Sequence, residues 1–140
     1  LILWNLRDGF PVSASSIVDY YGKKKAAFYA VKAAFEPIQC FVINKAEKAK
    51  VYIVNDTKIS KNGKILVRTS EEEILLSNSF SAENGVNEIA EIPVKIGQTI
   101  ISELVSDGKT IKNYAFVYKG KINYFEYKNA YEKTIEKILK

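Results

Sequence analysis

The chain has 140 residues, of which 47% are hydrophobic and 26% charged, and its formal net charge is +5. These values are ordinary for a soluble globular protein, and the length suffices for one hydrophobic core, or for one domain with an additional fragment. The chain has no histidine and one cysteine, Cys40. Histidine-based triads, Cys-His pairs, the usual zinc-hydrolase ligands and an internal disulfide are therefore excluded, and we expect neither a metal nor a cofactor.

No stretch approaches the roughly 18 uncharged apolar residues of a transmembrane helix. The apolar start is interrupted by Arg7 and Asp8, too soon for a signal peptide. We therefore expect no membrane partner and favour a cytoplasmic location. Because the chain lacks methionine and opens inside an apolar run, we expect residue 1 to be a cut or processing point, or the first ordered residue of a longer protein.

The positive charge raises nucleic acid as a partner. The lysines are scattered, however, and mostly interleaved with Asp or Glu; the one run is Lys23, Lys24 and Lys25. This pattern favours a solvated lysine-rich surface, and we expect no nucleic-acid partner. Nucleic-acid binding through lysines and tyrosines stays a third hypothesis, and it predicts an affinity that falls steeply with salt.

Residues 1–37 have the pattern of one strand-helix unit. The continuous apolar run at residues 1–4 is typical of a strand buried on both faces of a parallel sheet. A polar loop follows, and then residues 23–35 predict a helix that ends before Pro37. Three apolar residues of this helix recur on one face, namely Phe28, Val31 and Phe35.

After Pro37 the pattern becomes that of an all-β domain. Short runs rich in β-formers predict strands at residues 38–44, 50–54, 64–69, 73–80, 88–95, 100–105, 114–118 and 122–127. Turn residues separate several of them, at Asn55-Asp56, Asn62-Gly63, Asn84-Gly85, Asp107-Gly108 and Gly120. Seven or eight short strands in about 90 residues predict an immunoglobulin-like β-sandwich. We place it at residues 38–127, followed by a C-terminal helix or linker at residues 128–140.

Three segments near the start resemble motifs of the β-mannosidase-like enzymes of glycoside hydrolase family 2. Residues 4–11, WNLRDGFP, resemble the family's W-x-L-x-D-x-W-P; residues 19–29, DYYGKKKAAFY, resemble D-Y-Y-G-x-x-K-x-x-x-Y; residues 30–37, AVKAAFEP, resemble A-x-K-x-x-x-x-P. Downstream, residues 51–57, VYIVNDT, are similar to the V-x-N-D-T that opens the sandwich following the barrel.

The resemblance implies a mainly β fragment in which residues 1–37 form the last strand-helix unit of a catalytic (β/α)8 barrel, the TIM barrel. It also implies hydrolysis of a β-glycosidic bond with retention, by two glutamates on earlier barrel strands. Those glutamates would lie upstream, so this fragment holds no catalytic residue and should be inactive alone. Its expected partners are a β-linked oligosaccharide or glycoside and the remainder of the barrel, with self-association of the fragment if the barrel is missing.

The resemblance implies a substrate-binding role for Trp4, Asp8 and Asn5. The loop after a barrel strand faces the active site, and the flat ring of Trp4 suits stacking on a pyranose. Asp8 can accept hydrogen bonds from sugar hydroxyls, or equally from a loop N–H. Mannoside is the first choice of substrate, although galactoside, glucuronide and glucosaminide hydrolases share the architecture. Three departures leave the sugar open: Phe10 in place of a tryptophan, Arg7 in place of an asparagine, and Ala14 near a second tryptophan.

The alternative function is a non-catalytic carbohydrate-binding or structural sandwich from residue 38 onward. Surface aromatics at strand spacing would support it, and the candidates are Tyr114, Tyr118, Tyr124 and Tyr127. Alternate core and surface positions of two hairpin strands explain the same spacing. The acidic cluster at residues 71–73 is interpreted as a solvated strand edge rather than as catalytic carboxylates.

Overall fold

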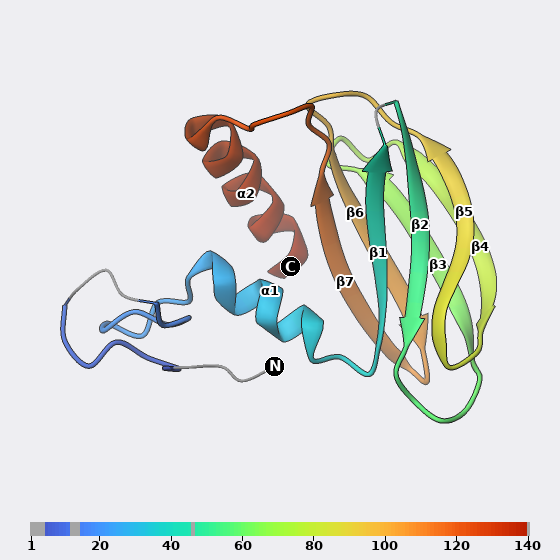
Figure 1. Ribbon diagram of the computed structural model, residues 1–140, viewed down its shortest axis with the longest axis horizontal. Helices are drawn as coiled ribbons and strands as arrows, with labels where there is room; N and C mark the ends of the chain where they lie inside the picture. Colours follow the sequence, from blue (N-terminus) through green and yellow to red (C-terminus); the bar gives the residue numbers. More distant parts are fainter. Residues whose placement is uncertain (1–4, 12–14, 46, 140) are drawn as a thin grey trace. The chain divides into compact units, whose positions relative to one another are not determined.

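The computed structural model describes residues 5–11, 15–45 and 47–139, and the side chains as far as Thr134. The chain forms two compact units, Leu1–Glu36 and Pro37–Lys140 (Figure 1). The strand predicted at residues 1–4 lies outside the described residues, so its membership of a barrel stays a prediction.

The first unit consists of an irregular segment and the helix α1, Ala26–Ala34. The helix begins three residues later than predicted because Lys24 instead forms an antiparallel bridge with Val18, which leaves Lys25 as the N-cap. Within this chain α1 has no buried residue. Phe28 and Val31 are half-buried, whereas Phe35 is 63% exposed. The predicted apolar face of the helix therefore exists but is incompletely covered.

The second unit is a sandwich of seven antiparallel strands in two sheets. One sheet has the order β1-β2-β5 and the other has the order β4-β3-β6-β7. The strands are β1 Ile38–Lys45, β2 Lys48–Asn55, β3 Lys61–Thr69, β4 Ile74–Ala82, β5 Gly85–Pro93, β6 Thr99–Ser106 and β7 Lys109–Phe116. The predicted mainly β sandwich is confirmed. In the constant-type immunoglobulin arrangement the fourth strand joins the sheet of the first, second and fifth; here β4 pairs with β3 instead.

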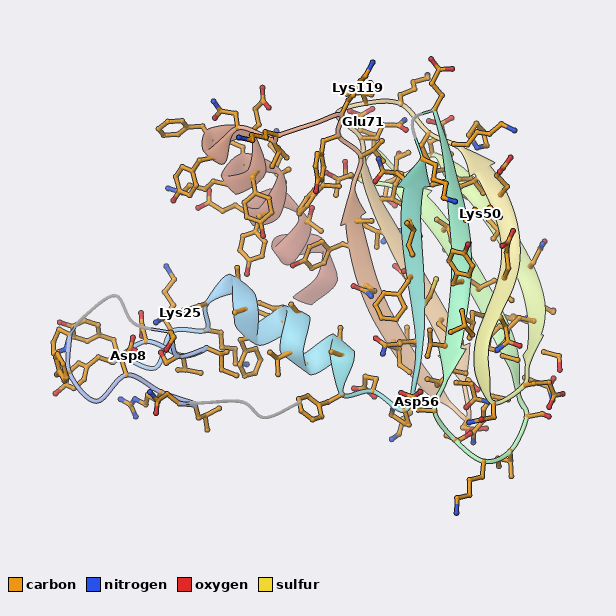
Figure 2. The ribbon with its side chains drawn as sticks, in the orientation of Figure 1. Asp8, Lys25, Lys50, Asp56, Glu71 and Lys119 are labelled. Atoms are coloured by element: carbon orange, nitrogen blue, oxygen red, sulfur yellow. The ribbon has the colours of Figure 1, made fainter. Side chains whose placement is uncertain are left out.

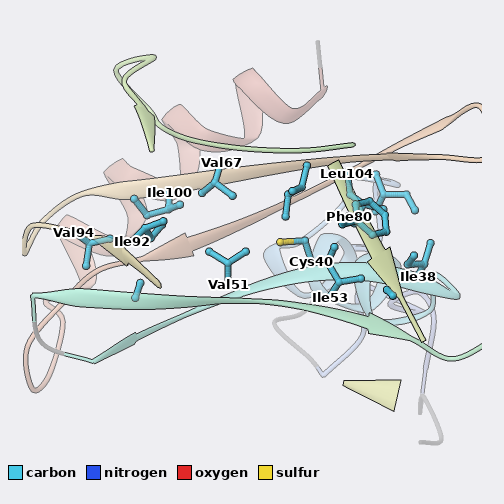
Figure 3. Packing of buried hydrophobic residues seen from close by; sticks show 14 of the residues in the cluster. Ile38, Cys40, Val51, Ile53, Val67, Phe80, Ile92, Val94, Ile100 and Leu104 are labelled. Atoms are coloured by element: carbon cyan, nitrogen blue, oxygen red, sulfur yellow. The ribbon is translucent and has the colours of Figure 1, made fainter. Parts of the chain in front are cut away.

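Alternating side chains from both sheets form the core between them (Figure 3). On β2 the inward residues Val51 and Ile53 are fully buried, and on β3 so is Val67, with Ile65 nearly so. Each fully buried aliphatic side chain stabilises the fold by about 1.5–3 kcal/mol. The period-two pattern that predicted strands is thus also the pattern that forms the core.

One predicted turn is wrong. Asn62 and Gly63 lie inside β3, because the absence of a side chain at Gly63 lets the strand pass close to its neighbour. A Cβ at Gly63 would lie 2.0 Å from the backbone oxygen of Val105. In contrast, Asn84-Gly85 and Asp107-Gly108 do stand at the predicted strand connections.

Asn55 is the first residue of the Asn-Asp-Thr segment at the end of β2, and it is fully buried. Its Nδ2 donates to the backbone oxygens of Ile59 and Ala82, both at 2.9 Å. Its Oδ1 accepts from the backbone N–H of Thr57 at 3.0 Å and from the Thr57 hydroxyl at 2.6 Å. A buried amide with all of these partners fixes the loop between β2 and β3.

The strand predicted at residues 122–127 is also wrong, because helix α2, Tyr124–Leu139, begins there. Asn123 caps it: its Oδ1 accepts the backbone N–H of Phe125 at 2.8 Å. Asn123 followed by Glu126 three residues later is a helix-start pattern, and it outweighs the β propensity of the surrounding tyrosines. The C-terminal segment, predicted as a helix or a linker at residues 128–140, is helical as far as Leu139, and the helix starts earlier than residue 128.

The four tyrosines proposed as a strand-spaced row do not form one. Tyr114 is on β7, Tyr118 is in the following connection, and Tyr124 and Tyr127 are on α2. Tyr127 packs instead against Phe116, with ring centroids 5.3 Å apart, and so helps to hold α2 on β7 (Figure 1). Among the described residues, no helix has the length and hydropathy needed to cross a membrane.

Candidate functional site

The candidate site lies in the first unit, where the segment containing Asp8 runs beside Val18. The Asp8 N–H donates to the Val18 carbonyl, and the Val18 N–H donates to the Leu6 carbonyl, both at 3.0 Å. These two bonds form an isolated parallel bridge between Arg7 and Val18. The side chain of Asp8 is consequently turned away from solvent, with only 1% of it exposed.

The Asp8 carboxylate is the centre of a three-residue cluster with Ser16 and Lys25. Ser16 Oγ donates to Asp8 Oδ1 at 2.5 Å, and Lys25 Nζ donates to Asp8 Oδ2 at 2.8 Å. Lys25 Nζ also lies 2.9 Å from Ser16 Oγ. A serine hydroxyl has one proton and two lone pairs, so it can give its proton to Asp8 while accepting one from Lys25. Figure 2 shows Asp8 and Lys25 directed toward one another.

The electrostatics of this cluster favour the charged carboxylate. The hydrogen bond from Lys25, and then the hydrogen bond from Ser16, hold the pKa of Asp8 below its ordinary value, against the opposing effect of desolvation. Asp8 is therefore ionised at neutral pH and acts as an acceptor, not as a proton donor. A group of this kind can orient its neighbours, but it is unsuited to general acid catalysis near neutral pH.

The cluster connects two of the sequence segments that resemble β-mannosidase motifs. Asp8 belongs to the first of the three segments of residues 4–37, and Lys25 belongs to the second. The ion pair between them joins a loop to the N-cap of α1. Sequence reasoning selected Asp8 but missed both Ser16 and Lys25. The lysine position in the second segment was the available signal, since a lysine at a helix start is otherwise unfavourable to the helix dipole.

Of the other two predicted site residues, Trp4 and Asn5, the structure describes only Asn5. Trp4 lies outside the described residues. Asn5 is exposed and has a φ of 62°, a left-handed conformation that asparagine tolerates. Its amide is thus open to a ligand, while Asp8 is enclosed. The structure brings Asp8 together with Ser16 and Lys25, and it does not bring Asn5 into that cluster.

Two further polar residues of this unit hold the loop. The Arg7 guanidinium donates to the Tyr20 carbonyl from Nε at 3.2 Å and from Nη2 at 2.5 Å. Asp19 Oδ1 accepts the Lys23 N–H at 2.7 Å, and Gly22 closes that turn with a φ of 86°. Arg7 therefore binds backbone in this unit rather than standing open to hydroxyls.

The acidic cluster at residues 71–73 has the features of a turn. Thr69 Oγ1 accepts the backbone N–H groups of Glu71 and Glu73, both at 3.2 Å. Glu72 pairs with Arg68 at 2.6 Å. Within the described part of the chain, no group of three or more acidic, Cys or His side chains has the geometry of a metal site.

Comparisons with known proteins find β-mannosidases among both the similar sequences and the similar structures. No protein-family profile matches the chain. The β-mannosidase B of Emericella nidulans is 29% identical over 110 residues, which are 79% of this chain and 12% of that protein. The β-mannosidase B of Aspergillus oryzae is 28% identical over 111 residues, with the same shares. The crystal structure of the β-D-mannosidase from Dictyoglomus thermophilum superimposes with a TM-score of 0.62 and 26% identity, over 82% of this chain and 16% of that chain.

The chain is similar to part of each of these β-mannosidases. It spans about an eighth of the length of the curated relatives that it matches. The structural match covers 82% of this chain and so extends over more residues than the sandwich alone.

Proposed function

We propose that this chain belongs to a retaining glycoside hydrolase that acts on β-linked sugars, with β-mannosides as the first choice of substrate. The observation that carries the proposal is the match to β-mannosidases in both sequence and structure. In this proposal the chain supplies part of the sugar-binding subsite and a supporting sandwich. The two glutamates, about 5 Å apart in a retaining enzyme, come from another part of the same protein.

The proposed subsite consists of Trp4, Asn5 and Asp8. Trp4 offers an apolar face for a sugar ring and one N–H donor. Asn5, exposed and left-handed, offers an amide that can both donate to and accept from hydroxyls. Asp8 supports them: with both carboxylate oxygens bound to Ser16 and Lys25, it fixes the loop that presents the other two. Because only 1% of its side chain is exposed, Asp8 can bind a sugar hydroxyl directly only if the enclosing residues move.

Exposed apolar groups in the first unit support a role within a larger barrel. Leu6 is 63% exposed, Phe10 is 65% exposed and Phe35 is 63% exposed. In the proposed barrel, neighbouring strands and helices cover these side chains and complete the partial burial of α1. The same exposure underlies the proposal that the isolated chain self-associates.

Substitutions in the full-length enzyme test the subsite. Trp4→Ala is expected to lower kcat/KM for an aryl β-mannoside by roughly tenfold or more, which corresponds to about 1.4 kcal/mol. Tyr124→Ala, an exposed aromatic on the sandwich unit, is the matched control and should leave kcat/KM unchanged. Equal effects of the two substitutions, or no effect of either, would remove Trp4 from the subsite.

A pair of variants separates the two roles of Asp8. Asp8→Asn and Lys25→Met each break the same ion pair. If Asp8 acts by positioning the loop alone, both variants raise KM to a similar extent. If Asp8 also binds a hydroxyl, Asp8→Asn loses more kcat/KM than Lys25→Met does. Unchanged kinetics in both variants would contradict either role.

A further inference from the structure

The sandwich unit contains a pocket of about 500 Å³ at one end of its four-stranded sheet. This volume lies within the range of small-molecule sites. The turn after β3, the β5–β6 loop, the β7–α2 connection and α2 itself form its walls. Figure 2 shows Glu71 and Lys119 at this end of the sandwich. None of its residues belongs to the first unit, so the pocket is independent of the subsite proposed above.

One polar face of α2 lines the pocket. Glu126, Asn129, Ala130 and Lys133 recur with the i, i+3, i+4, i+7 spacing of a single helix face. Other residues of the helix fix its position: Tyr131 lies 6.3 Å from the Tyr114 ring, centroid to centroid, and Tyr127 packs on Phe116 as described above. Packing and ligand-facing residues therefore occupy different faces of α2.

Main-chain hydrogen bonds hold the opposite wall. The Gly97 N–H donates to the Val117 carbonyl at 2.8 Å, and the Val117 N–H donates to the Gln98 carbonyl at 2.9 Å. The Ser70 N–H donates to the Thr99 carbonyl at 2.8 Å. Three separate segments are thus joined before any ligand arrives, which is the condition for a preformed pocket.

Six charged or amide side chains of the pocket are available to a ligand. Within the described part of the chain, the side chains of Glu71, Glu126 and Asn129 have no hydrogen bond or ion pair with another residue. The same holds for the three lysines of the lining, Lys119, Lys121 and Lys133. Between these groups stand apolar surfaces, among them Tyr118, which is 47% exposed.

The mixture of charges selects the class of ligand. The two carboxylates, on different walls, repel an anionic ligand, and the three ammonium groups repel a cationic one. Carboxylates accept hydroxyl protons, ammonium groups donate to hydroxyl oxygens, and the Asn129 amide does both. The Tyr118 ring can cover the C–H face of a pyranose. We propose that this pocket binds a neutral oligosaccharide and forms a non-catalytic sugar site on the sandwich.

NMR titration of the 15N-labelled 140-residue chain with β-1,4-mannobiose, cellobiose and glucuronic acid tests the proposal. A neutral disaccharide is expected to shift the amides of Gly97, Gln98 and Lys119 saturably, with a Kd of roughly 1 mM, or about −4.1 kcal/mol. Absence of saturable shifts with both disaccharides would overturn the site. Tighter binding of glucuronic acid than of either disaccharide would overturn the neutral class of ligand.

Matched variants locate the binding. Tyr118→Ala and Glu126→Gln should each weaken the Kd at least fivefold. Their controls, Tyr124→Ala and Glu132→Gln, carry the same changes on side chains outside the pocket and should leave it unchanged. Equal effects in variants and controls would contradict the assignment. Trp4→Ala should leave this Kd unchanged, so failure of the hydrolase proposal and failure of this site give different results.

Discussion

Lys25 Nζ lies 2.8 Å from Asp8 Oδ2, across 17 residues of sequence, and Ser16 Oγ binds both groups. This contact closes the loop that precedes α1 and draws a carboxylate out of solvent. Asp8 and Lys25 belong to two of the three sequence segments that resemble β-mannosidase motifs.

The pH dependence of the stability of this loop follows from the direction in which the pKa of Asp8 is shifted. Because Lys25 and then Ser16 lower the folded-state pKa of Asp8, the stabilisation is complete at neutral pH. It is lost as the pH falls below the ordinary Asp value, about 3.9, and through the folded pKa. The 13C shift of the Asp8 carboxyl should therefore titrate at a lower pH than that of an ordinary aspartate. A midpoint at or above the ordinary value would contradict the ion pair.

Gly63→Ala should destabilise the sandwich by about 1–3 kcal/mol. The added Cβ would lie 2.0 Å from the Val105 oxygen and 2.9 Å from the Phe80 ring, so β3 and β6 must separate. The control is Gly9→Ala, where a Cβ meets nothing within 4 Å; its effect should stay within about 0.5 kcal/mol. Urea unfolding measures both, and equal midpoints for the two variants would show that the close approach is not required.

Asn55→Ala should cost about 2–4 kcal/mol, because it removes four hydrogen bonds and takes the Asn55 donor away from the buried carbonyl of Ala82. Asn78→Ala, at an exposed position on β4, provides the comparison. Asn55→Asp is a sharper variant: it keeps the shape but turns an acceptor toward the carbonyls of Ile59 and Ala82. If Asn55→Asp were as stable as the parent chain, the orientation of the Asn55 amide described above would be wrong.

Cys40 should be unreactive in the folded chain. Desolvation raises the pKa of its buried thiol to about 11, with a hydrogen bond to Ser102 acting in the opposite direction. Since the thiolate is the reactive form, iodoacetamide at pH 8 should label Cys40 only after unfolding. Rapid labelling of the native protein would contradict its burial.

The raised pKa of Cys40 also predicts a loss of folding stability at high pH. The unfolded thiol ionises near 9 whereas the folded one does not until about 11, so the unfolded state is favoured progressively between these values. Cys40→Ala should flatten this part of the stability curve relative to the parent chain. Identical slopes for both proteins would mean that Cys40 does not contribute.

The sandwich was predictable because its pattern is local. Alternation along β2 and β3, with Asn84-Gly85 and Asp107-Gly108 at chain reversals, is visible in any short window of sequence. Two features, the turn at Gly63 and the strand near residue 124, were predicted wrongly because packing or helix capping outweighed the local residue preferences. Gly63 resembles a turn residue but serves strand contact, and the tyrosines near residue 124 favour a strand while Asn123 caps a helix.

The site was less predictable, since its key contacts are tertiary. Nothing in the sequence alone pairs Asp8 with Lys25 and Ser16, although the motif spacing marks two of the three. Likewise, the pocket of the sandwich unit collects residues from four segments, and no single segment carries a motif for it.

The most direct test of the central claim is hydrolysis by the full-length protein, followed by 1H NMR of the first sugar released. With 4-nitrophenyl β-D-mannoside, we predict release of nitrophenol and initial appearance of β-mannose, the anomer that retention produces. Other β-glycosides should be cleaved more slowly. Absence of hydrolysis of every β-glycoside tested, or initial release of the α anomer, would contradict the proposed function.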